Sequence, residues 1–283
     1  MPHPAMTAGN VALITGGASG IGLAAAMWLA RRGLKICIAD LGSDHLSHAA
    51  ALLAKAAPDG AAGVMAHEAD VSRPEDVRKL HDAVLSRYGG VDILMNNAGV
   101  QPGSGVSGPA DSWARVLSVN LGGVVNCTQV FVPGMIARGK PGLVINTGSK
   151  QGITTPPGDP AYNVSKAGVK VFTEALAHEL RNTAGCKIDA HLLIPGFVFT
   201  GLTARGRTEK PAGAWTPEQT VDFMIERIEA KDFYILCPDN EVHRSIDEKR
   251  ILWAAGDIIE NRPPLSRWHP NYSEAFATFV KKG

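Results

Sequence analysis

The chain has 283 residues, of which 45% are hydrophobic and 19% charged, a composition that supplies one substantial apolar core. The 28 Lys and Arg residues nearly balance the 27 Asp and Glu residues, and the basic residues form pairs rather than stripes, which disfavours a nucleic-acid partner. The N-terminus lacks a signal-peptide pattern, and no apolar run reaches the ~18 residues of a membrane span, so we expect a soluble cytoplasmic protein with no membrane partner.

Short apolar segments alternate with longer amphipathic ones along most of the chain. This alternation predicts strands at 11–15, 34–40, 63–70, 91–95, 143–147, 187–194 and 233–237. It predicts helices at 21–32, 43–57, 73–88, 111–138, 159–181 and 217–230. Strands joined by helix-length crossovers form right-handed βαβ units. We therefore expect an α/β fold of the Rossmann type: a doubly wound parallel sheet of about seven strands with helices on both faces.

The alternation ends near residue 238. Two more helical stretches are predicted at 240–259 and 272–280, joined by Arg262, Pro263 and Pro264. No linker divides the chain, so residues 1–283 are expected to form a single domain, with a core of about 10–238. The C-terminal extension, about 239–283, should pack on this domain or on a neighbouring subunit.

Cysteine and histidine residues show no metal-binding pattern. Cys37, Cys127, Cys186 and Cys237 stand far apart, without CxxC spacing, which is typical of reduced thiols. His45 and His48 are three residues apart, but no carboxylate or cysteine completes a site beside them. We expect no metal.

A glycine-rich turn follows the first predicted strand and leads directly into a helix. Its sequence is Thr15-Gly16-Gly17-Ala18-Ser19-Gly20-Ile21-Gly22. Glycines permit a tight turn and let the backbone approach a pyrophosphate, which lies at the positive helix N-terminus. A purely structural turn is the alternative, but strand and helix lie on the correct sides for a nucleotide loop.

Asp40 ends the second predicted strand, 18 residues after Gly22. A carboxylate at this distance accepts hydrogen bonds from the adenosine ribose hydroxyls and repels the 2′-phosphate of NADP. Leu41 follows, and the glycine loop contains no Arg or Lys. These features favour NAD, although a simple strand-end aspartate is the alternative.

With Asn96-Asn97-Ala98-Gly99 after the fourth strand, the chain resembles the classical short-chain dehydrogenase/reductase (SDR) family over about 10–200. The resemblance implies that Asp70 and Val71 contact adenine, and that Val198 and Thr200, after Pro195-Gly196, hold the nicotinamide carboxamide. The implied cofactor-binding residues are Gly16, Ser19, Gly20, Ile21, Gly22, Asp40, Leu41, Asp70, Val71, Asn97, Ala98, Gly99, Tyr162, Lys166, Pro195, Gly196, Val198 and Thr200.

Tyr162 and Lys166 lie four residues apart, a spacing that places both side chains on one face of a helix. Asp159 and Pro160 are predicted as the N-cap and first helical residue, so Tyr162 lies in the first turn. The nearby ammonium and the helix N-terminus should lower the phenol pKa from about 10 by ~1–3 units. That shift would suit Tyr162 for general acid/base catalysis.

Ser149 lies 13 residues before Tyr162, at the end of the fifth predicted strand, where its hydroxyl can hold the substrate oxygen. Asn120 lies in a long helix that Gly122-Gly123 weakens. The resemblance implies that a helix interruption there exposes a backbone carbonyl to a water near Lys166. Asn120, Ser149, Tyr162 and Lys166 thus match the catalytic tetrad of the family.

We therefore predict an NAD-dependent enzyme that interconverts a secondary alcohol and a ketone by hydride transfer. Two alternatives are an NADPH-dependent carbonyl reductase and a catalytically silent protein that senses a dinucleotide. The pocket is expected to be bordered by Val100, Gln101, 151–153, Pro156, Pro157, Phe197, Phe199 and 201–215, which slightly favours an aromatic or alicyclic substrate.

Segment 201–215 carries Arg205, Arg207 and Lys210. These cations would attract an anionic substrate, or they belong to the solvated surface of a mobile lid. The mobile lid is the favoured interpretation. The Asp-Gly-Gly element of many family members is missing after Cys237. This puts the usual homotetramer in doubt, and a homodimer through 111–138 and 159–181 is plausible.

Overall fold

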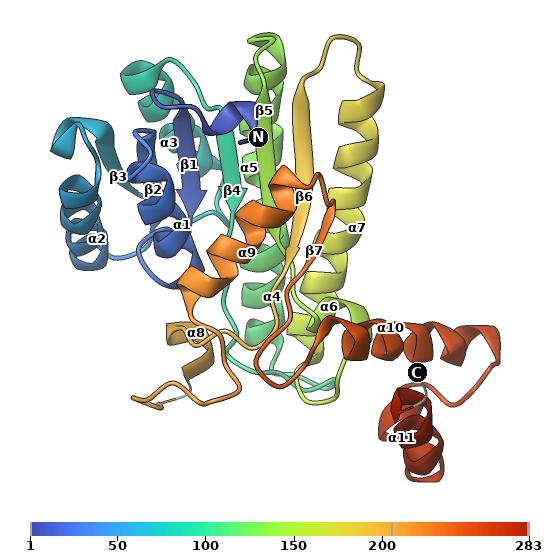
Figure 1. Ribbon diagram of the computed structural model, residues 1–283. Helices are drawn as coiled ribbons and strands as arrows, with labels where there is room; N and C mark the ends of the chain where they lie inside the picture. Colours follow the sequence, from blue (N-terminus) through green and yellow to red (C-terminus); the bar gives the residue numbers. More distant parts are fainter. Residues whose placement is uncertain (1, 205, 282–283) are drawn as a thin grey trace.

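Seven parallel strands form the central sheet, in the order β3-β2-β1-β4-β5-β6-β7 (Figure 1). The structure is a computed structural model that describes residues 2–204 and 206–281. The strands are β1 (Val11–Thr15), β2 (Lys35–Asp40), β3 (Val64–Glu68), β4 (Ile93–Asn96), β5 (Gly142–Thr147), β6 (Ile188–Ile194) and β7 (Tyr234–Leu236). The predicted fold class is confirmed.

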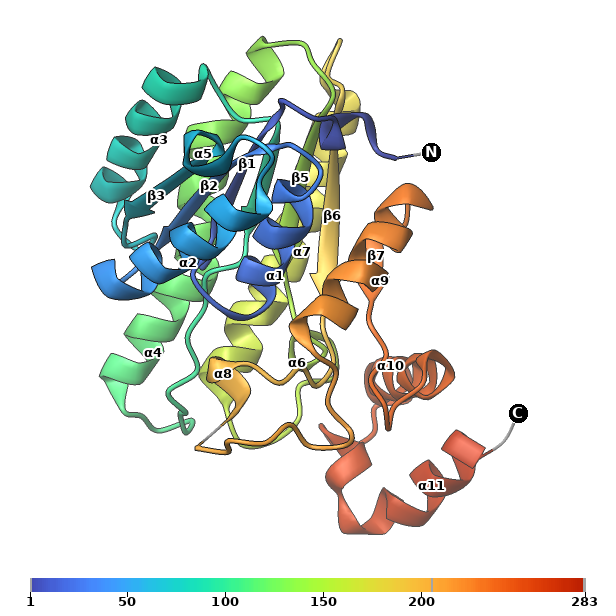
Figure 2. The same cartoon turned by 60° about the vertical axis from the view of Figure 1, so that its left-hand side comes forward.

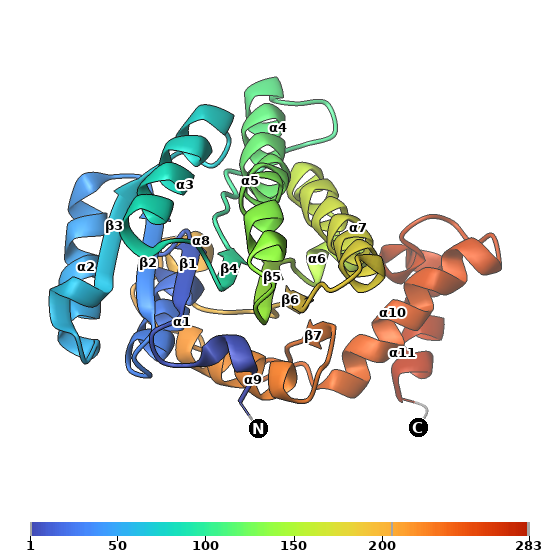
Figure 3. The same cartoon turned by 90° about the horizontal axis from the view of Figure 1, so that it is seen from above.

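Helices cover both faces of this sheet (Figure 3). Helices α1 (Gly20–Ala30), α2 (Ser43–Ala56) and α9 (Pro217–Glu229) pack on one face, and α3 (Pro74–Tyr88), α5 (Gly123–Ala137) and α7 (Pro160–Asn182) pack on the other. Successive side chains of β1 enter opposite cores, with Leu13 facing the α3/α5/α7 side and Ile14 the α1/α2/α9 side. Both are fully buried, as the continuous apolar run of a doubly covered strand predicts.

The helix predicted at 111–138 consists of three parts. Helix α4 (Ala110–Leu117) passes into a π-helical turn, η3 (Ser118–Gly122), and then into α5. Together they form a helix of 28 residues, Ala110–Ala137, that is long and apolar enough to cross a membrane by length and composition alone. The expectation that no segment meets this criterion is wrong. The helix packs against α3 and α7 within the domain, as a core helix does.

Other differences from the predicted elements are short. Strand β3 ends at Glu68 rather than residue 70, because Asp70 closes a turn in which its Oδ1 accepts hydrogen bonds from Ser72 N and Oγ. The elements that periodicity missed span only three or four residues each: α6 (Gln151–Thr154), α8 (Gly201–Ala204), η1 (Pro4–Met6), η2 (Gly60–Gly63), η4 (Ser266–Trp268) and η5 (Pro270–Tyr272).

The C-terminal extension forms two helices, α10 (Arg244–Ile259) and α11 (Ser273–Lys281), which project from the β7 side of the domain (Figures 1 and 2). The ring of Trp253 joins them, with its centroid 5.3 Å from the rings of both Phe276 and Phe279. Helix α10 contacts α6, so the extension meets the domain beside the loop that follows β5.

Candidate active site

A cavity of about 910 Å³ lies at the carboxyl edge of the sheet, where ligands bind in open α/β folds. The loops after β1, β2, β3, β4, β5 and β6 all contribute to its lining. Every predicted cofactor-binding residue except Gly22 lines this cavity, and so does Ser149. Of the four predicted catalytic residues, only Asn120 lies outside the lining.

The glycine loop requires its glycines for backbone conformation and for close packing. Gly16 and Gly20 have φ values of +63° and +54°, which disfavour any residue with a Cβ. A Cβ on Gly16 would lie 2.8 Å from Cα of Ala98, and one on Gly22 would lie 2.2 Å from the carbonyl oxygen of Gly16. Gly22 therefore lies behind the glycine loop, where the lack of a Cβ lets the first turn of α1 pack closely against that loop.

Two asparagines at the carboxyl end of β4 stabilise this region: Asn97, directly after the strand, binds the glycine loop, and Asn96, its last residue, binds β5. Asn97 Nδ2 donates to the carbonyl oxygens of Thr15 and Gly16, at 3.2 Å each. Asn96 Nδ2 donates to Asn146 Oδ1 at 2.8 Å in the buried layer between β4 and β5. These bonds fix the floor of the cavity, and the open backbone cradle between the glycine loop and Ala98 fits a dinucleotide pyrophosphate.

Asp40 lies at the β2 end of the cavity beside the glycine loop. Its Oδ2 accepts a hydrogen bond from Ala18 N at 2.9 Å, and its Oδ1 accepts one from Leu41 N at 2.8 Å. Among the described residues, the cations that line the cavity are Arg115, Lys150 and Lys166, and none belongs to the loops around Asp40. The electrostatic field at this end is thus set by a carboxylate.

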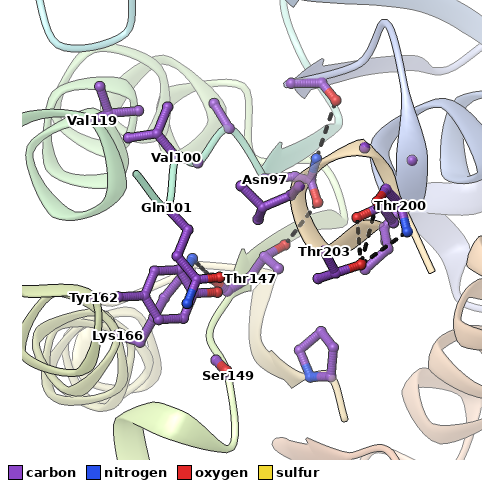
Figure 4. A pocket seen from close by; sticks show the side chains of 18 of the residues that line it. Asn97, Val100, Gln101, Val119, Thr147, Ser149, Tyr162, Lys166, Thr200 and Thr203 are labelled. Atoms are coloured by element: carbon purple, nitrogen blue, oxygen red, sulfur yellow. Dashed lines mark hydrogen bonds between the residues drawn. The ribbon is translucent and has the colours of Figure 1, made fainter. Parts of the chain in front are cut away.

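Tyr162 and Lys166 project from the first turns of α7 into the other end of the cavity, near Ser149 (Figure 4). Both are almost completely buried, at 7% and 4% exposure. Lys166 Nζ donates to the carbonyl oxygen of Thr147 at 2.7 Å and lies 5.7 Å from the centroid of the Tyr162 ring.

Burial controls the ionisation of this pair. It raises the pKa of Tyr162 to about 12, while the side chain of Ser149 lowers this pKa and the charge of Asp159 raises it. Burial also lowers the pKa of Lys166 to about 8. The expectation that neighbouring charge lowers the pKa of Tyr162 is therefore wrong, because removal of water outweighs the favourable interactions.

The start of α7 is capped differently from the prediction. Asp159 occupies the N-cap position, but its side chain makes no capping hydrogen bond. Ser104 supplies it instead: its Oγ accepts a hydrogen bond from Ala161 N at 3.0 Å and donates one to Asp159 Oδ1 at 2.6 Å. A residue 57 positions upstream thus sets the helix start beneath Tyr162.

Asn120 is fully buried within the π-helical turn η3. Its Oδ1 accepts a hydrogen bond from Val100 N at 2.8 Å, and its Nδ2 donates to Val100 O at 3.0 Å and to Ser165 Oγ at 3.2 Å. The side chain therefore braces the loop after β4 against α7. The adjacent Gly123 is required by packing, since a Cβ there would lie 2.5 Å from Cγ2 of Val71.

Other predicted pocket residues divide into two groups. Val100, Gln101, Gln151 and Phe197 line the cavity, as do residues 201–203. Arg207 and Lys210 do not, and Lys210 Nζ instead donates to Ala214 O at 2.8 Å; Arg205 lies outside the described residues. Sequence analysis missed Lys150 and Asp239, which line the cavity but belong to no motif.

Comparison with known proteins identifies the family. The family model for short chain dehydrogenases matches residues 10–211. A 3-oxoacyl-(acyl-carrier-protein) reductase of Thermotoga maritima is 35% identical over 198 residues, 70% of this chain and 77% of that protein. The chain therefore belongs to the short-chain dehydrogenase/reductase family. It is an oxidoreductase that acts on CH–OH groups or the corresponding carbonyls.

Two solved structures resemble the fold closely. A short-chain dehydrogenase/reductase from Burkholderia phymatum in complex with NAD is 33% identical, with a TM-score of 0.81 over 92% of this chain and 97% of that one. An actinorhodin polyketide ketoreductase with NADPH is 27% identical, with a TM-score of 0.70 over 79% of this chain and 92% of that one. Relatives of this fold thus use either nicotinamide cofactor.

Proposed function

We propose that the protein is an NAD(H)-dependent oxidoreductase that interconverts a secondary alcohol and a ketone, with Tyr162 as general acid and base. The observation that carries this proposal is that the buried side chains of Tyr162 and Lys166 line, together with Ser149, the same cavity as the glycine loop. When bound, the nicotinamide donates or accepts the hydride. Ser149 would hold the substrate oxygen, and Tyr162 would donate a proton to it in reduction or accept one in oxidation.

Lys166 and Asn120 are proposed to complete the proton path. The ammonium of Lys166 is held at Thr147 O, one helical turn from Tyr162. Asn120 lies in the π-helical turn, where regular i→i−4 bonding is interrupted. We propose that its backbone carbonyl and Lys166 pass the proton between Tyr162 and solvent through a water.

NAD is proposed as the cofactor because Asp40 is fixed in place by two backbone N–H groups at the adenosine end. A 2′-phosphate beside this carboxylate would suffer like-charge repulsion that costs several kcal/mol. The NAD complex of the Burkholderia phymatum relative supports this proposal, whereas the ketoreductase with NADPH supports the alternative. Comparing the affinities for NADH and NADPH tests it.

The substrate proposal rests on the lining near Tyr162. Val100, Phe197 and Leu202 supply apolar contacts that suit the aromatic or alicyclic body of an alcohol or ketone. Gln101 adds a polar feature, because its Nε2 is buried and has no hydrogen-bond partner among the described residues. We propose that this amide donates to a second oxygen of the substrate, close to the reacting carbon.

We also propose a cytoplasmic homo-oligomer, with a dimer formed through α5 and α7. Val164 and Val171 of α7 are 49% and 62% exposed and lie seven residues apart, on one face of the helix. A second subunit would remove this apolar stripe from water. Sedimentation of the wild type and of Val171→Asp checks the assembly, and a monomeric wild type would exclude it.

The test of function follows NADH absorbance across a panel of secondary alcohols and ketones. Tyr162→Phe removes the proton donor but keeps the ring, so it should abolish turnover and leave NADH binding nearly unchanged. Retained turnover in this variant would contradict the assignment of Tyr162. A wild type that binds NADH but turns over no substrate would favour the alternative of a dinucleotide-sensing protein.

A further inference from the structure

A buried cluster of charges lies between the cavity and the C-terminal extension. Lys150, the residue after Ser149, lines the cavity, and its Nζ is 2.6 Å from Asp247 Oδ2 and 3.5 Å from Asp239 Oδ2. The two carboxylate side chains are only 6% and 8% exposed. Arg250 extends the cluster, with its guanidinium 3.7 Å from Asp247 Oδ1. Asp247 and Arg250 belong to α10, so the ammonium of Lys150 is held by the extension.

The same cluster contacts the loop that follows β6. Asp239 Oδ2 accepts a hydrogen bond from Phe197 N at 3.3 Å, and Lys150 N donates to Pro195 O at 3.3 Å. Gly196 lies against both charged groups, because a Cβ there would be 2.7 Å from Asp239 Oδ2 and 2.9 Å from Lys150 Nζ. The loop that carries Pro195, Gly196 and Val198 therefore rests on the ion pair.

The energetics of buried ion pairs argue against a purely stabilising role for this cluster. Desolvation of a buried pair offsets much of its Coulomb attraction, and replacement of such a pair by apolar side chains is often neutral or stabilising. What the pair does provide is a defined geometry, since each charge must stay close to its partners. Here the defined geometry joins three segments that meet at the candidate active site.

We propose that Lys150, Asp239 and Asp247 are positioning residues, through which helix α10 fixes the loop after β5 and the loop after β6 relative to each other. The inference rests on the proposed function, in which Ser149 holds the substrate oxygen, and on the contact between Val198 and the nicotinamide carboxamide that the family resemblance implies. The C-terminal extension thereby becomes part of the active-site framework. Its role is to keep the nicotinamide and the substrate oxygen in register for hydride transfer.

The variant Asp247→Asn tests this role in the full-length protein. Misplacement of reacting groups by about 1 Å can lower a rate by about a hundredfold, so kcat should fall by roughly ten- to a hundredfold. The wild type should bind NADH more tightly than ADP-ribose, and the variant should lose most of this difference in affinity. The reason is that ADP-ribose lacks the nicotinamide, the part of NADH that reaches the loop after β6. Affinity for ADP-ribose should stay unchanged, since the glycine loop and Asp40 are not part of the cluster. Asp247→Glu, which keeps the charge, should restore part of kcat.

Two further variants separate positioning from folding. Lys150→Met/Asp247→Met removes the closer pair together, while Asp239 keeps its hydrogen bonds from the backbone N–H groups of Phe197, Glu241 and Val242. We therefore expect a thermal midpoint close to that of the wild type with the same loss of kcat. Glu248→Gln is the matched control, because Glu248 lies on the same helix in an exposed pair with Arg244 at 2.9 Å. It should leave all parameters unchanged.

The proposal would be overturned if Lys150→Met/Asp247→Met kept the wild-type kcat and the wild-type difference in affinity between NADH and ADP-ribose. Equal losses of NADH and ADP-ribose affinity would overturn it too, because they would indicate a general structural defect. The affinity difference is measured without turnover, so it tests the positioning role even where the Tyr162→Phe experiment contradicts the proposed chemistry.

Discussion

Replacing Lys166 by methionine should change the stability of the protein in a manner that depends on pH. Burial lowers the pKa of this ammonium from 10.5 to about 8, so the folded state binds the proton more weakly than the unfolded state does. Each pKa unit corresponds to about 1.4 kcal/mol, which makes the cost of the charged form about 3 kcal/mol at pH 7. The cost is complete below about pH 8, decreases as the pH rises, and is absent above the unfolded pKa of 10.5.

The variant also loses the hydrogen bond from Nζ to Thr147 O, at 2.7 Å. A hydrogen bond to a charged group contributes about 1.5–3 kcal/mol, so the net change at pH 7 should be small or slightly stabilising. The pH dependence is the clearer signal. Between pH 7 and about 9.5, the wild type should gain about 2 kcal/mol of unfolding free energy relative to Lys166→Met.

Urea unfolding followed by tryptophan fluorescence at the two pH values measures this difference. Lys170→Met is the control, because Lys170 lies one turn further along α7 in a pair with Glu174 that is about one-third exposed. Its stability relative to the wild type should change little between the two pH values. A difference between wild type and Lys166→Met that is the same at both pH values would refute the reasoning from burial.

Three predictions concern turnover. Because the phenol of Tyr162 stays protonated, kcat/KM for ketone reduction should be nearly constant from about pH 6 to pH 8, whereas kcat/KM for alcohol oxidation should rise about tenfold per pH unit. If the pH–rate profile of oxidation reaches a plateau within that range, the pKa of Tyr162 is not raised. Asp40→Ala should raise the NADPH-to-NADH affinity ratio by ~10-fold or more in a fluorescence titration, and an unchanged ratio would mean that Asp40 does not select the cofactor. Gln101→Leu should raise KM about tenfold for ketones with a second oxygen near the carbonyl but not for simple ketones; an equal effect on both would remove the proposed hydrogen bond.

Features of the fold and site that depend on residues close together in the sequence were predictable from the sequence. The glycine loop follows a strand and opens a helix, and that local order is sufficient to locate Gly16 and Gly20 at the carboxyl edge of the sheet. Asp40 and Asn97 end or follow strands of the same parallel sheet, so they had to reach the same edge. Gly16, Gly20, Asp40 and Asn97 all line the cavity.

Contacts between distant segments were not predictable. Asn120 binds Val100 and Ser165, which are 20 and 45 residues away, and no spacing rule links them. Low helix propensity at Gly122-Gly123 predicted only a weakened helix, and the interruption itself was implied by the family resemblance. The structure adds a second reason for Gly123, its close approach to Val71, and this contact appears only when the loop after β3 packs on α5. Lys150 and Asp247 likewise meet although they lie far apart in the sequence.

The direction of the pKa shift of Tyr162 was predicted wrongly from the sequence. The spacing to Lys166 predicted a nearby positive charge, and a positive charge lowers a phenol pKa. The spacing contains no information about water, which the packing of α7 against η3 and the loop after β5 removes from both groups. The same burial that raises the pKa of Tyr162 lowers that of Lys166, so both shifts favour neutral side chains. With its pKa raised, Tyr162 holds its proton at neutral pH. On the proposed function, we therefore expect the wild type to reduce ketones more readily than it oxidises alcohols at that pH.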